Sequence, residues 1–344
     1  MRQTWLSRTG SKPTHYKYLT AQGKQVTARR ATQIDVLAIP PAWTDVHIAT
    51  SDRSAIQAWG FDARGRKQYR YHPNAVKRGQ RRKYYRVRQM GRDLPAIRRR
   101  VHSDFRKKGM PREKVCAAIV RFLSDGFFRI GNDRYAKENG TFGLTTLKKS
   151  HVRVNGDVIL FDYVGKRSIR HHQTVVSRDL ARFVSSLLKV RGSRLFRYQD
   201  ADGHWHNIES SQVNQYLQDV ADFPYSAKDF RTWGGTLRAA TVLADLGPAK
   251  SERDAVRNVA TTIRLVAAEL GNTPAICRKA YVHPVVIERY VESGDTIQVP
   301  SGAACDGATG SRASGSHTAE EHALIQFLDT HFPERRKHRR TESD

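Results

Sequence analysis

The stretch LGNTPAICRKAY, residues 270–281, contains a helix end, then a helix start and then a tyrosine. Gly271 and Asn272 end helices readily because both tolerate a positive φ, and Thr273–Pro274 can cap and open the next helix. The pattern predicts that Tyr281 lies about two turns into a short helix, anchored to a core helix. That upstream core helix has an apolar stripe at the three-and-four spacing that buries one face: Val256, Val259, Ile263, Val266 and Leu270.

The charge balance is strongly basic. The chain has 344 residues, and 60 Lys and Arg against 33 Asp and Glu leave a formal charge of +27 and a pI near 10.4. Such an excess attracts polyanions, so nucleic acid is the favoured partner, ahead of an anionic membrane surface. A binder of the histone or ribosomal type, without chemistry of its own, fits the composition too.

The cysteines and the apolar runs indicate the compartment. Cys116, Cys277 and Cys305 are far apart, and no CxxC or histidine pair of metal-ligand spacing accompanies them. We therefore expect a reducing compartment, no disulfides and no bound metal. No apolar run approaches a membrane span, and the start lacks the apolar core of a secretory signal. We expect a cytoplasmic protein that associates with the nucleoid if it binds DNA.

The first part of the chain predicts an arm and a small β domain. Residues 1–30 are polar and basic and predict an arm, whereas residues 31–90 contain short β-like pieces separated by Pro, Asp and Gly. In the predicted strand Gln68–His72, Tyr69 and Tyr71 share one face because strand side chains alternate. These tyrosines, beside a glutamine, could contact DNA. A packed aromatic face in a small sheet fits the pattern equally well.

A dense basic run connects this domain to the next. It has no acidic residue before Asp93, so it would repel itself unless an anion neutralised it. We expect it to form a hinge between the domains and part of a phosphate-contacting rim, and to continue into a helix at 94–108. Its members are Lys77, Arg78, Arg81, Arg82, Lys83, Arg86, Arg88, Arg92, Arg98, Arg99 and Arg100.

Residues 91–294 predict a mostly helical second domain, with one β-hairpin embedded around the Asn155–Gly156 turn. The hairpin ends at Gly165–Lys166, which places a lysine at a tight turn. The predicted fold class is therefore α+β, a small, mainly antiparallel β domain followed by a larger helical one. Residues 295–344 predict a flexible linker, a short helix and a basic tail. The predicted helices of the second domain include 114–128, 178–187, 211–221 and 228–246.

Common catalytic motifs are missing from the sequence. It contains no GxxxxGK[ST], no GxGxxG after a strand, no HExxH and no acidic cluster suited to two metal ions. If a phosphodiester is attacked here, the protein must supply its own nucleophile and its own positive charge.

Five short segments, taken in order, resemble the successive catalytic segments of type IB DNA topoisomerases, most closely the compact bacterial and poxvirus kind. Each segment alone is a weak signal, but their shared order is specific. IPPAW and GRKQYRYH also resemble that family's small β domain, so the likeness covers roughly residues 30–292. The five segments are FFRIGNDRY (127–135), GLTTLKKSHV (143–152), YVGKRSI (163–169), KDFRTWGGT (228–236) and LGNTPAICRKAY (270–281).

The resemblance implies a role for each matching residue. Tyr281 would attack a DNA phosphodiester and leave a 3′-phosphotyrosine, while Arg129 and Arg231 brace the phosphate oxygens. Lys166 would protonate the departing 5′-oxygen, which arginine does less readily. The family usually has a histidine at the position of Asn272, whose amide can still donate a hydrogen bond to phosphate but cannot shuttle a proton.

The resemblance also implies an activity and a partner. The protein would nick one strand of duplex DNA, let supercoils relax and reseal the strand as a monomer that clamps the duplex, without ATP, cofactor or required metal. Poxvirus members have a lysine where this chain has Asn132, so a helper acid is not expected there. The residues expected to contact DNA are Gln68, Tyr69, Tyr71, Arg81, Arg82, Lys83 and Tyr135.

Other interpretations stay open. A tyrosine recombinase uses the same chemistry between paired sites, and a DNA-compacting protein with a decayed site would keep the charge without the reaction. Taken singly, Lys166 could be a solvated turn residue, and His171 and His172 could be exposed polar groups. Tyr290 is a rival nucleophile, but nearby glutamates oppose a phosphate, so we expect it to pack in the core or on the surface.

Overall fold

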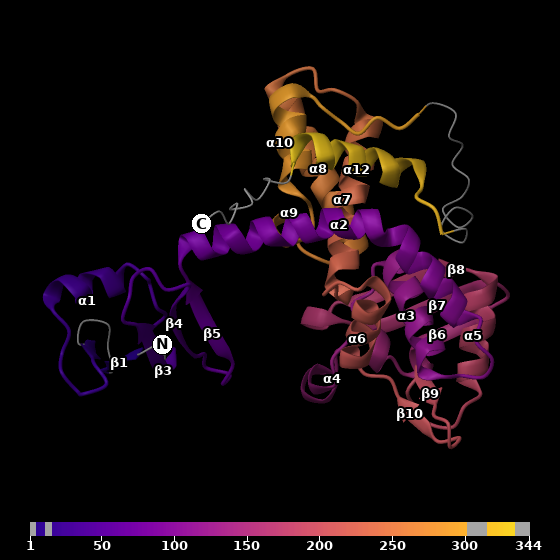
Figure 1. The fold of residues 1–344 in the computed structure, drawn as a ribbon, viewed down its shortest axis with the longest axis horizontal. Helices are drawn as coiled ribbons and strands as arrows, with labels where there is room; N and C mark the ends of the chain where they lie inside the picture. Colours follow the sequence, from indigo (N-terminus) through magenta and orange to yellow (C-terminus); the bar gives the residue numbers. More distant parts are fainter. Residues whose placement is uncertain (1–4, 11–15, 301–314, 334–344) are drawn as a thin grey trace, which may run out of the picture. The chain divides into compact units, whose positions relative to one another are not determined.

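The computed structural model describes residues 5–10, 16–300 and 315–333. The chain divides into two compact units, Met1–Tyr84 and Tyr85–Asp344, and each is described by itself. The predicted α+β class is confirmed: a small antiparallel sheet comes first and a mostly helical unit follows (Figure 1). None of the described helices is both long and apolar enough to cross a membrane.

The first unit contains a five-stranded antiparallel sheet in the order β2-β1-β3-β4-β5, with helix α1 (Ala28–Asp35). Two of its strands lie in residues 1–30, which we predicted to form a polar arm, so that prediction is wrong. Leu6 of β1 and Tyr18 of β2 are buried in the core of this unit, so the segment is part of the fold. The strands are β1 (Trp5–Thr9), β2 (Lys17–Leu19), β3 (Thr44–Ala49), β4 (Ile56–Phe61) and β5 (Lys67–Tyr71).

The basic run is helical along its whole length. Helix α2 extends over Pro73–Phe105, so the helix expected at 94–108 begins about twenty residues earlier. The apolar residues between the arginines explain this difference, because they recur at helical spacing and are all buried in the second unit. They are Val87, Met90, Leu94, Ile97 and Val101.

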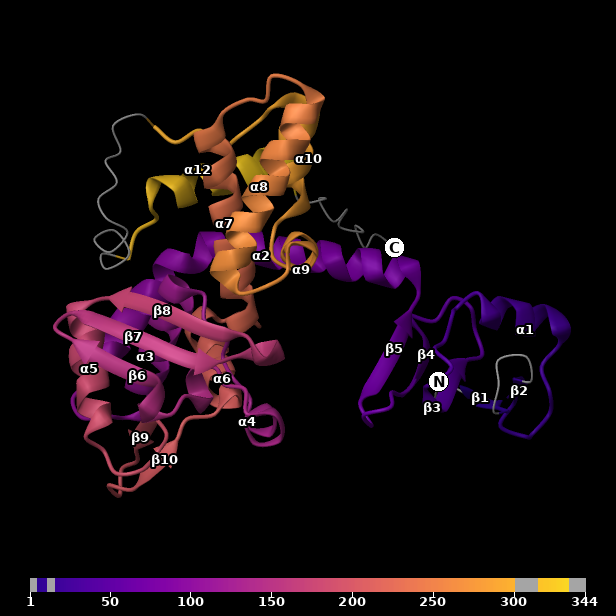
Figure 2. The same cartoon turned by 180° about the vertical axis from the view of Figure 1, so that it is seen from behind.

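Helices make up most of the second unit (Figures 1 and 2). The predicted helices at 114–128, 178–187, 211–221 and 228–246 are confirmed to within two residues at each end as α3, α5, α6 and α7. The buried face of α8 contains Val259, Ile263, Val266 and Leu270, whereas Val256, which we placed in that stripe, is 59% exposed. The helices are α3 (Arg112–Gly126), α4 (Asp133–Asn139), α5 (Arg178–Leu188), α6 (Ser210–Ala221), α7 (Ala227–Leu246), α8 (Glu252–Leu270), α9 (Pro274–Ala280), α10 (Pro284–Ser293) and α12 (Ala319–His331).

The embedded β structure is larger than the predicted hairpin. Strands β6 (Val152–Asn155) and β7 (Val158–Val164) form that hairpin, and Gly156 in its turn has a φ of 58°. A third strand, β8 (Arg170–Val176), pairs with β7. Helix α5 packs on β6 and β7, and α3 packs on β8 (Figure 2). A separate small hairpin joins β9 (Arg197–Gln199) and β10 (Trp205–Asn207).

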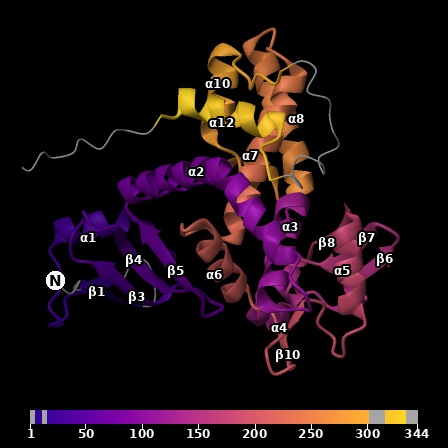
Figure 3. The ribbon, with the colours of Figure 1, turned by 45° about the vertical axis from the view of Figure 1, so that its right-hand side comes forward.

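The short helix expected near the carboxyl end is confirmed as α12, which packs against α7 (Figure 3). It is part of the core, because Leu324 and Leu328 are fully buried and the Glu321 carboxylate pairs with Arg98. Cys305, most of the predicted linker and the basic tail lie outside the described residues. Cys116 and Cys277 are free and buried.

Candidate active site

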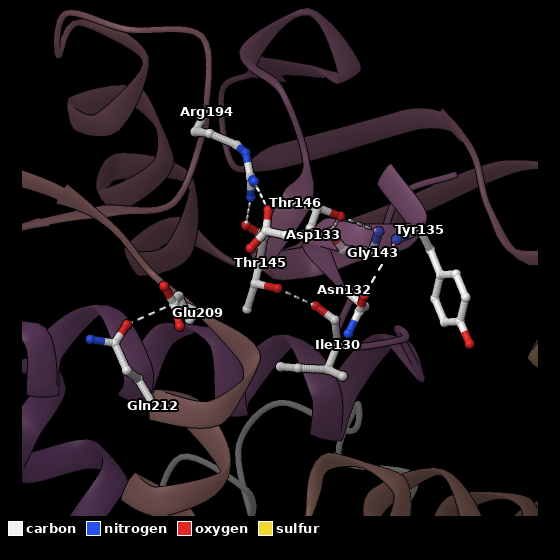
Figure 4. A network of polar contacts seen from close by, with 10 residues as sticks. All are labelled: Ile130, Asn132, Asp133, Tyr135, Gly143, Thr145, Thr146, Arg194, Glu209 and Gln212. Atoms are coloured by element: carbon white, nitrogen blue, oxygen red, sulfur yellow. Dashed lines mark hydrogen bonds and ion pairs between the residues drawn. The ribbon is translucent and has the colours of Figure 1, made fainter. Parts of the chain in front are cut away.

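Arg129 lies in a loop that a neighbouring turn holds by its backbone. The amide of Leu144 donates to the Arg129 carbonyl at 2.9 Å. The amide and hydroxyl of Thr145 donate to the Ile130 carbonyl at 2.8 and 2.9 Å (Figure 4). The segments FFRIGN and GLTT are therefore structural partners, and the second fixes the position from which the Arg129 side chain extends.

The same loop is held from the other side (Figure 4). Arg194 donates to the Thr145 carbonyl at 2.5 Å and pairs with the Asp133 carboxylate. The Asn132 side chain caps α4 by accepting from the amide of Tyr135 at 3.3 Å. Asn132 therefore has a structural partner, while the Tyr135 side chain beyond it is 54% exposed.

Arg231 enters the site from α7 and is only 4% exposed. Its Nη2 donates to the Leu270 carbonyl at 2.7 Å, and its Nη1 donates to the Phe127 carbonyl. Leu270 is the last residue of α8, so the guanidinium also lies at the negative end of that helix dipole. Phe127 has a φ of 52°, an unusual backbone conformation for a phenylalanine, which turns its carbonyl toward Arg231.

Two glycines on α7 let the other segments approach. A side chain at Gly234 would collide with the Phe127 ring, and a Cβ at Gly235 would lie 2.9 Å from the Tyr281 carbonyl oxygen. Thr236, one residue further, donates its hydroxyl to the same carbonyl at 3.3 Å. The sequence WGGT thus brings the tyrosine segment against α7 next to Arg231.

The helix stop and start predicted around Asn272 are confirmed. Helix α8 ends at Leu270 and is capped by Gly271, which has a φ of 58°. The Thr273 hydroxyl accepts from the amide of Ile276 at the start of α9. Tyr281 directly follows the last residue of α9, about two turns after its start, and is half-buried.

Four of the predicted catalytic residues converge. Arg129 Nη2 donates to Asn272 Oδ1 at 2.7 Å and to the Gly271 carbonyl at 2.9 Å. The Arg231 guanidinium carbon lies 5.1 Å from the centroid of the Tyr281 ring. Arg129 and Arg231 thus meet beside the tyrosine and the asparagine, although the four residues come from three distant segments.

The charges of this cluster are uncompensated. Within the described chain, neither arginine forms an ion pair with a carboxylate, and the buried Arg231 Nε and Asn272 Nδ2 have no hydrogen-bond partner. Burial, followed by the charge of Arg129, lowers the pKa of Arg231 to about 10, and burial lowers the pKa of Arg129. Buried cations and orphaned donors are costly unless an anion satisfies them. The cluster is suited to bind an oxyanion such as a phosphate.

Lys166 lies at the β7–β8 turn, as predicted, with an exposed side chain. Gly165 closes the turn by donating its amide to the Ile169 carbonyl at 2.7 Å. Arg167 and Ser168 both have left-handed backbones, with φ of 66° and 58°. Such strain in non-glycine residues is concentrated at functional sites. In the described structure, Lys166 makes no hydrogen bond to the other four predicted residues.

His171 reaches the site, so the open alternative that it is merely an exposed polar group does not hold. It is half-buried on β8, with Nε2 3.4 Å from Arg129 Nη1, whereas the side chain of its neighbour His172 is 70% exposed. The period-two pattern of a third strand was the available signal, since one of two adjacent histidines must then face inward. Tyr290 packs in the core, as expected, and its hydroxyl donates to the Gly247 carbonyl at 2.8 Å.

The predicted DNA contacts on β5 lie on both faces of the strand. Tyr69 and Tyr71 are 40% and 52% exposed with rings 5.7 Å apart, so they do not form a buried aromatic face. Gln68 lies on the opposite face and donates to Asp62 at 2.9 Å. On α2, Arg81 and Arg82 are exposed.

One group of described residues could offer three ligand atoms to a metal ion: Asp200, Asp202 and His204 at the exposed β9–β10 turn. The Asp200 carboxylate already accepts from two backbone amides of that turn and contacts His206 at 2.6 Å. The group belongs to a turn that does not contain any of the predicted catalytic residues.

Comparison with known proteins agrees with this geometry. The catalytic core model of eukaryotic DNA topoisomerase I matches residues 73–300, more than half of the chain and all five predicted catalytic residues. The chain belongs to this family. The amino-terminal domain model of bacterial DNA topoisomerase IB matches residues 15–62, within the first unit.

Viral relatives match across most of the chain. A DNA topoisomerase 1B of Acanthamoeba polyphaga mimivirus is 28% identical over 297 residues, which cover 84% of this chain and 88% of that protein. The DNA topoisomerase 1B of vaccinia virus is 26% identical over 236 residues, 67% of this chain and 70% of that protein. The similarity to type IB topoisomerases therefore includes both units.

Proposed function

We propose that this type IB topoisomerase family member nicks one strand of duplex DNA through Tyr281 and reseals it. The observation that carries the proposal is a pair of arginines, the buried Arg231 and the half-buried Arg129, that have no carboxylate partner within the described chain and lie beside a tyrosine and the unpaired Nδ2 of Asn272. In a metal-dependent enzyme, cations bound by acidic residues stabilise the negative charge that builds on phosphoryl oxygens. Here Arg129 and Arg231 would do so, in a site already organised before the substrate arrives.

The reaction would proceed by exchange of one phosphodiester for another. The Tyr281 hydroxyl oxygen bonds to phosphorus, its proton passes to water, and the bond to the 5′-oxygen breaks. A 3′-phosphotyrosine and a free 5′-hydroxyl result. Because the ester keeps the bond energy, the 5′-hydroxyl can attack it in the reverse step without ATP, and supercoils relax by rotation in between.

Lys166 would supply the proton that the departing 5′-oxygen needs. A lysine suits this role because its ammonium gives up a proton more readily than a guanidinium does. Lys166 lies on an exposed turn and makes no hydrogen bond to the other four residues in the described structure. Its side chain would therefore have to reach the 5′-oxygen after DNA has bound.

The remaining basic and aromatic residues would hold the duplex. Tyr69 and Tyr71 offer exposed rings on one face of β5, and Arg81, Arg82 and Lys83 contribute positive charge that binds phosphates with little sequence preference. Gln68 could reach DNA only by releasing Asp62. We propose a monomer that clamps duplex DNA and works at the nucleoid, with no cofactor.

Relaxation of supercoiled plasmid in EDTA and without nucleotide tests the proposal. We expect a ladder of relaxed topoisomers, and a covalent protein–DNA adduct when the reaction is stopped with denaturant. Tyr281→Phe should abolish both products while duplex binding persists, and the matched control Tyr290→Phe should retain both. Relaxation by Tyr281→Phe would overturn the assignment.

Two other results would point to other functions. Binding that salt reverses, with no adduct from the unaltered protein, would indicate an architectural DNA-binding protein. A requirement for two specific sites and a protein tetramer would indicate a recombinase.

A further inference from the structure

The His171 imidazole fills a slot between two glycines that belong to different catalytic segments. Gly165 opens the turn that carries Lys166, and a Cβ there would lie 2.5 Å from His171 Cδ2. Gly271 precedes Asn272, and a Cβ there would collide with His171 Cε1. Because both walls are in close contact with the ring, the histidine has little freedom to reorient. It joins two segments that are more than one hundred residues apart in sequence.

Stacking fixes the ring plane. His171 stacks on Tyr163, its partner across the β7–β8 ladder, with centroids 5.3 Å apart and planes 20° apart. The Tyr163 hydroxyl donates to Gln173 Oε1 at 2.8 Å, and Gln173 Nε2 donates to the Gly126 carbonyl at 2.7 Å. Gly126 ends α3, immediately before the segment that contains Arg129. The contacts therefore tie the ring to the same chain segment as the arginine.

The charge state of the imidazole suits it to accept a hydrogen bond from a cation. Burial, followed by the nearby charges of Arg129 and Arg231, lowers the pKa of His171 to about 4. The ring is thus neutral at neutral pH, and Nε2 can accept from Arg129 Nη1 when the proton sits on Nδ1. Arg129 donates with its other terminal nitrogen to Asn272 Oδ1. The guanidinium is therefore held from two sides.

We propose that His171 is a positioning residue for strand cleavage, which orients the Arg129 guanidinium toward the phosphate through the hydrogen bond at Nε2. The proposal rests on the function proposed above. His171 itself need not touch DNA. Its effect passes through Arg129. Its ring also packs against Gly165 and Gly271, and so holds the Lys166 turn and the Asn272 turn next to each other.

Single-turnover cleavage of a duplex whose cleaved end dissociates would measure the effect. We expect His171→Phe, which keeps a flat ring but no acceptor, to slow cleavage by about tenfold in the folded protein, with little change in duplex affinity. His171→Gln, whose amide oxygen can accept, should stay within about threefold of the unaltered protein. His172→Phe is the matched control on the opposite face of the same strand and should cleave at the normal rate.

A double-mutant cycle separates positioning of Arg129 from general support of the fold. In an Arg129→Ala background, the further change His171→Phe should alter the already low rate by less than about twofold. A tenfold loss in that background, equal defects in the Phe and Gln variants, or normal cleavage by both would overturn the proposal. Each comparison requires that the unaltered protein cleaves, so failure of the proposed function would be seen first and separately.

Discussion

The arginines at the candidate active site and those along α2 differ in their partners. Arg98 forms two hydrogen bonds of 2.7 and 2.8 Å to Glu321, Arg92 pairs with Asp329 at 2.7 Å, and Arg86 pairs with Asp229 at 2.9 Å. Among the described residues, the partners of Arg129 and Arg231 are instead carbonyls, an amide oxygen, an imidazole and the Tyr281 side chain.

This difference means that the number of basic residues overstates the charge that has no carboxylate partner within the protein. We expected the whole basic run from Lys77 to Arg100 to form part of a phosphate-contacting rim. Carboxylates within the protein already neutralise Arg86, Arg92 and Arg98, so part of that charge holds α2 to α7 and α12. In the part of the chain that the structure describes, Arg129 and Arg231 have no such carboxylate partner.

Arg129→Ala should produce the largest effect. Removing one preorganised donor to a developing oxyanion costs about 10²–10³-fold in rate, and we expect cleavage to fall by that amount. The melting temperature should change little, because the variant also removes a desolvated charge. Single-turnover cleavage and thermal unfolding would measure the two quantities.

The matched control for that variant is Arg92→Ala. Arg92 is an exposed partner in a surface ion pair, where removal costs about 0–1 kcal/mol of stability and should leave the cleavage rate unchanged. If both variants lost activity to the same degree, the contrast between compensated and uncompensated arginines would have no functional meaning.

Arg98→Ala should reverse the pattern, with a loss of stability and an intact reaction. The Glu321 side chain is only 2% exposed, so the variant leaves a buried carboxylate without its cation. Breaking such a pair costs about 3–5 kcal/mol. Urea unfolding should show a lower midpoint, while the folded fraction at low temperature cleaves normally.

A paired substitution checks the reason for that loss. Arg98→Met with Glu321→Leu removes both charges and should recover most of the stability, because apolar residues of similar volume can replace a buried ion pair. Failure to recover would mean that the ion pair itself is not what α12 depends on.

Local signals explain what the sequence predicted correctly. Gly271 and Thr273–Pro274 mark a helix end and start by their own backbone preferences, and Asn155–Gly156 marks a hairpin in the same way. Strand β1 could not be predicted from local signals, because it pairs with β3 about forty residues away and its flanking residues are polar. The start of α2 was missed because arginines surround its apolar stripe.

The site was predictable to the extent that each residue lies in a recognisable segment. Arg129, Arg231, Asn272 and Tyr281 come together as the order of the segments implied. His171 was missed because its place depends on which face of β8 turns inward and on two glycines that admit its ring, the nearby Gly165 and the distant Gly271. The strand pattern indicates that one of the two adjacent histidines faces inward, but it does not show which one, and it does not show that Gly271 packs against the ring.

The smallest expected effect is a dependence of stability on pH, caused by the burial of His171 and, after it, by the two nearby arginines. The pKa of His171 is lowered from 6.5 to about 4 by burial, Arg129 and Arg231, and Tyr163 also faces the ring. In the unfolded chain the His171 imidazole therefore becomes protonated below about pH 6.5, whereas in the folded chain it stays neutral until about pH 4. Stability should fall as the pH drops through this window, by on the order of 1 kcal/mol after solvent screening.

Urea midpoints between pH 7 and pH 4 would show this loss of stability. His171→Gln should remove the part of the loss that comes from the His171 imidazole. A histidine proton titration by NMR gives the pKa directly, and Arg129→Gln should raise it because one of the two nearby charges is gone. If the pKa of His171 did not respond to Arg129→Gln, the charge of Arg129 would already be neutralised. Arg129 would then not differ from the α2 arginines that pair with carboxylates.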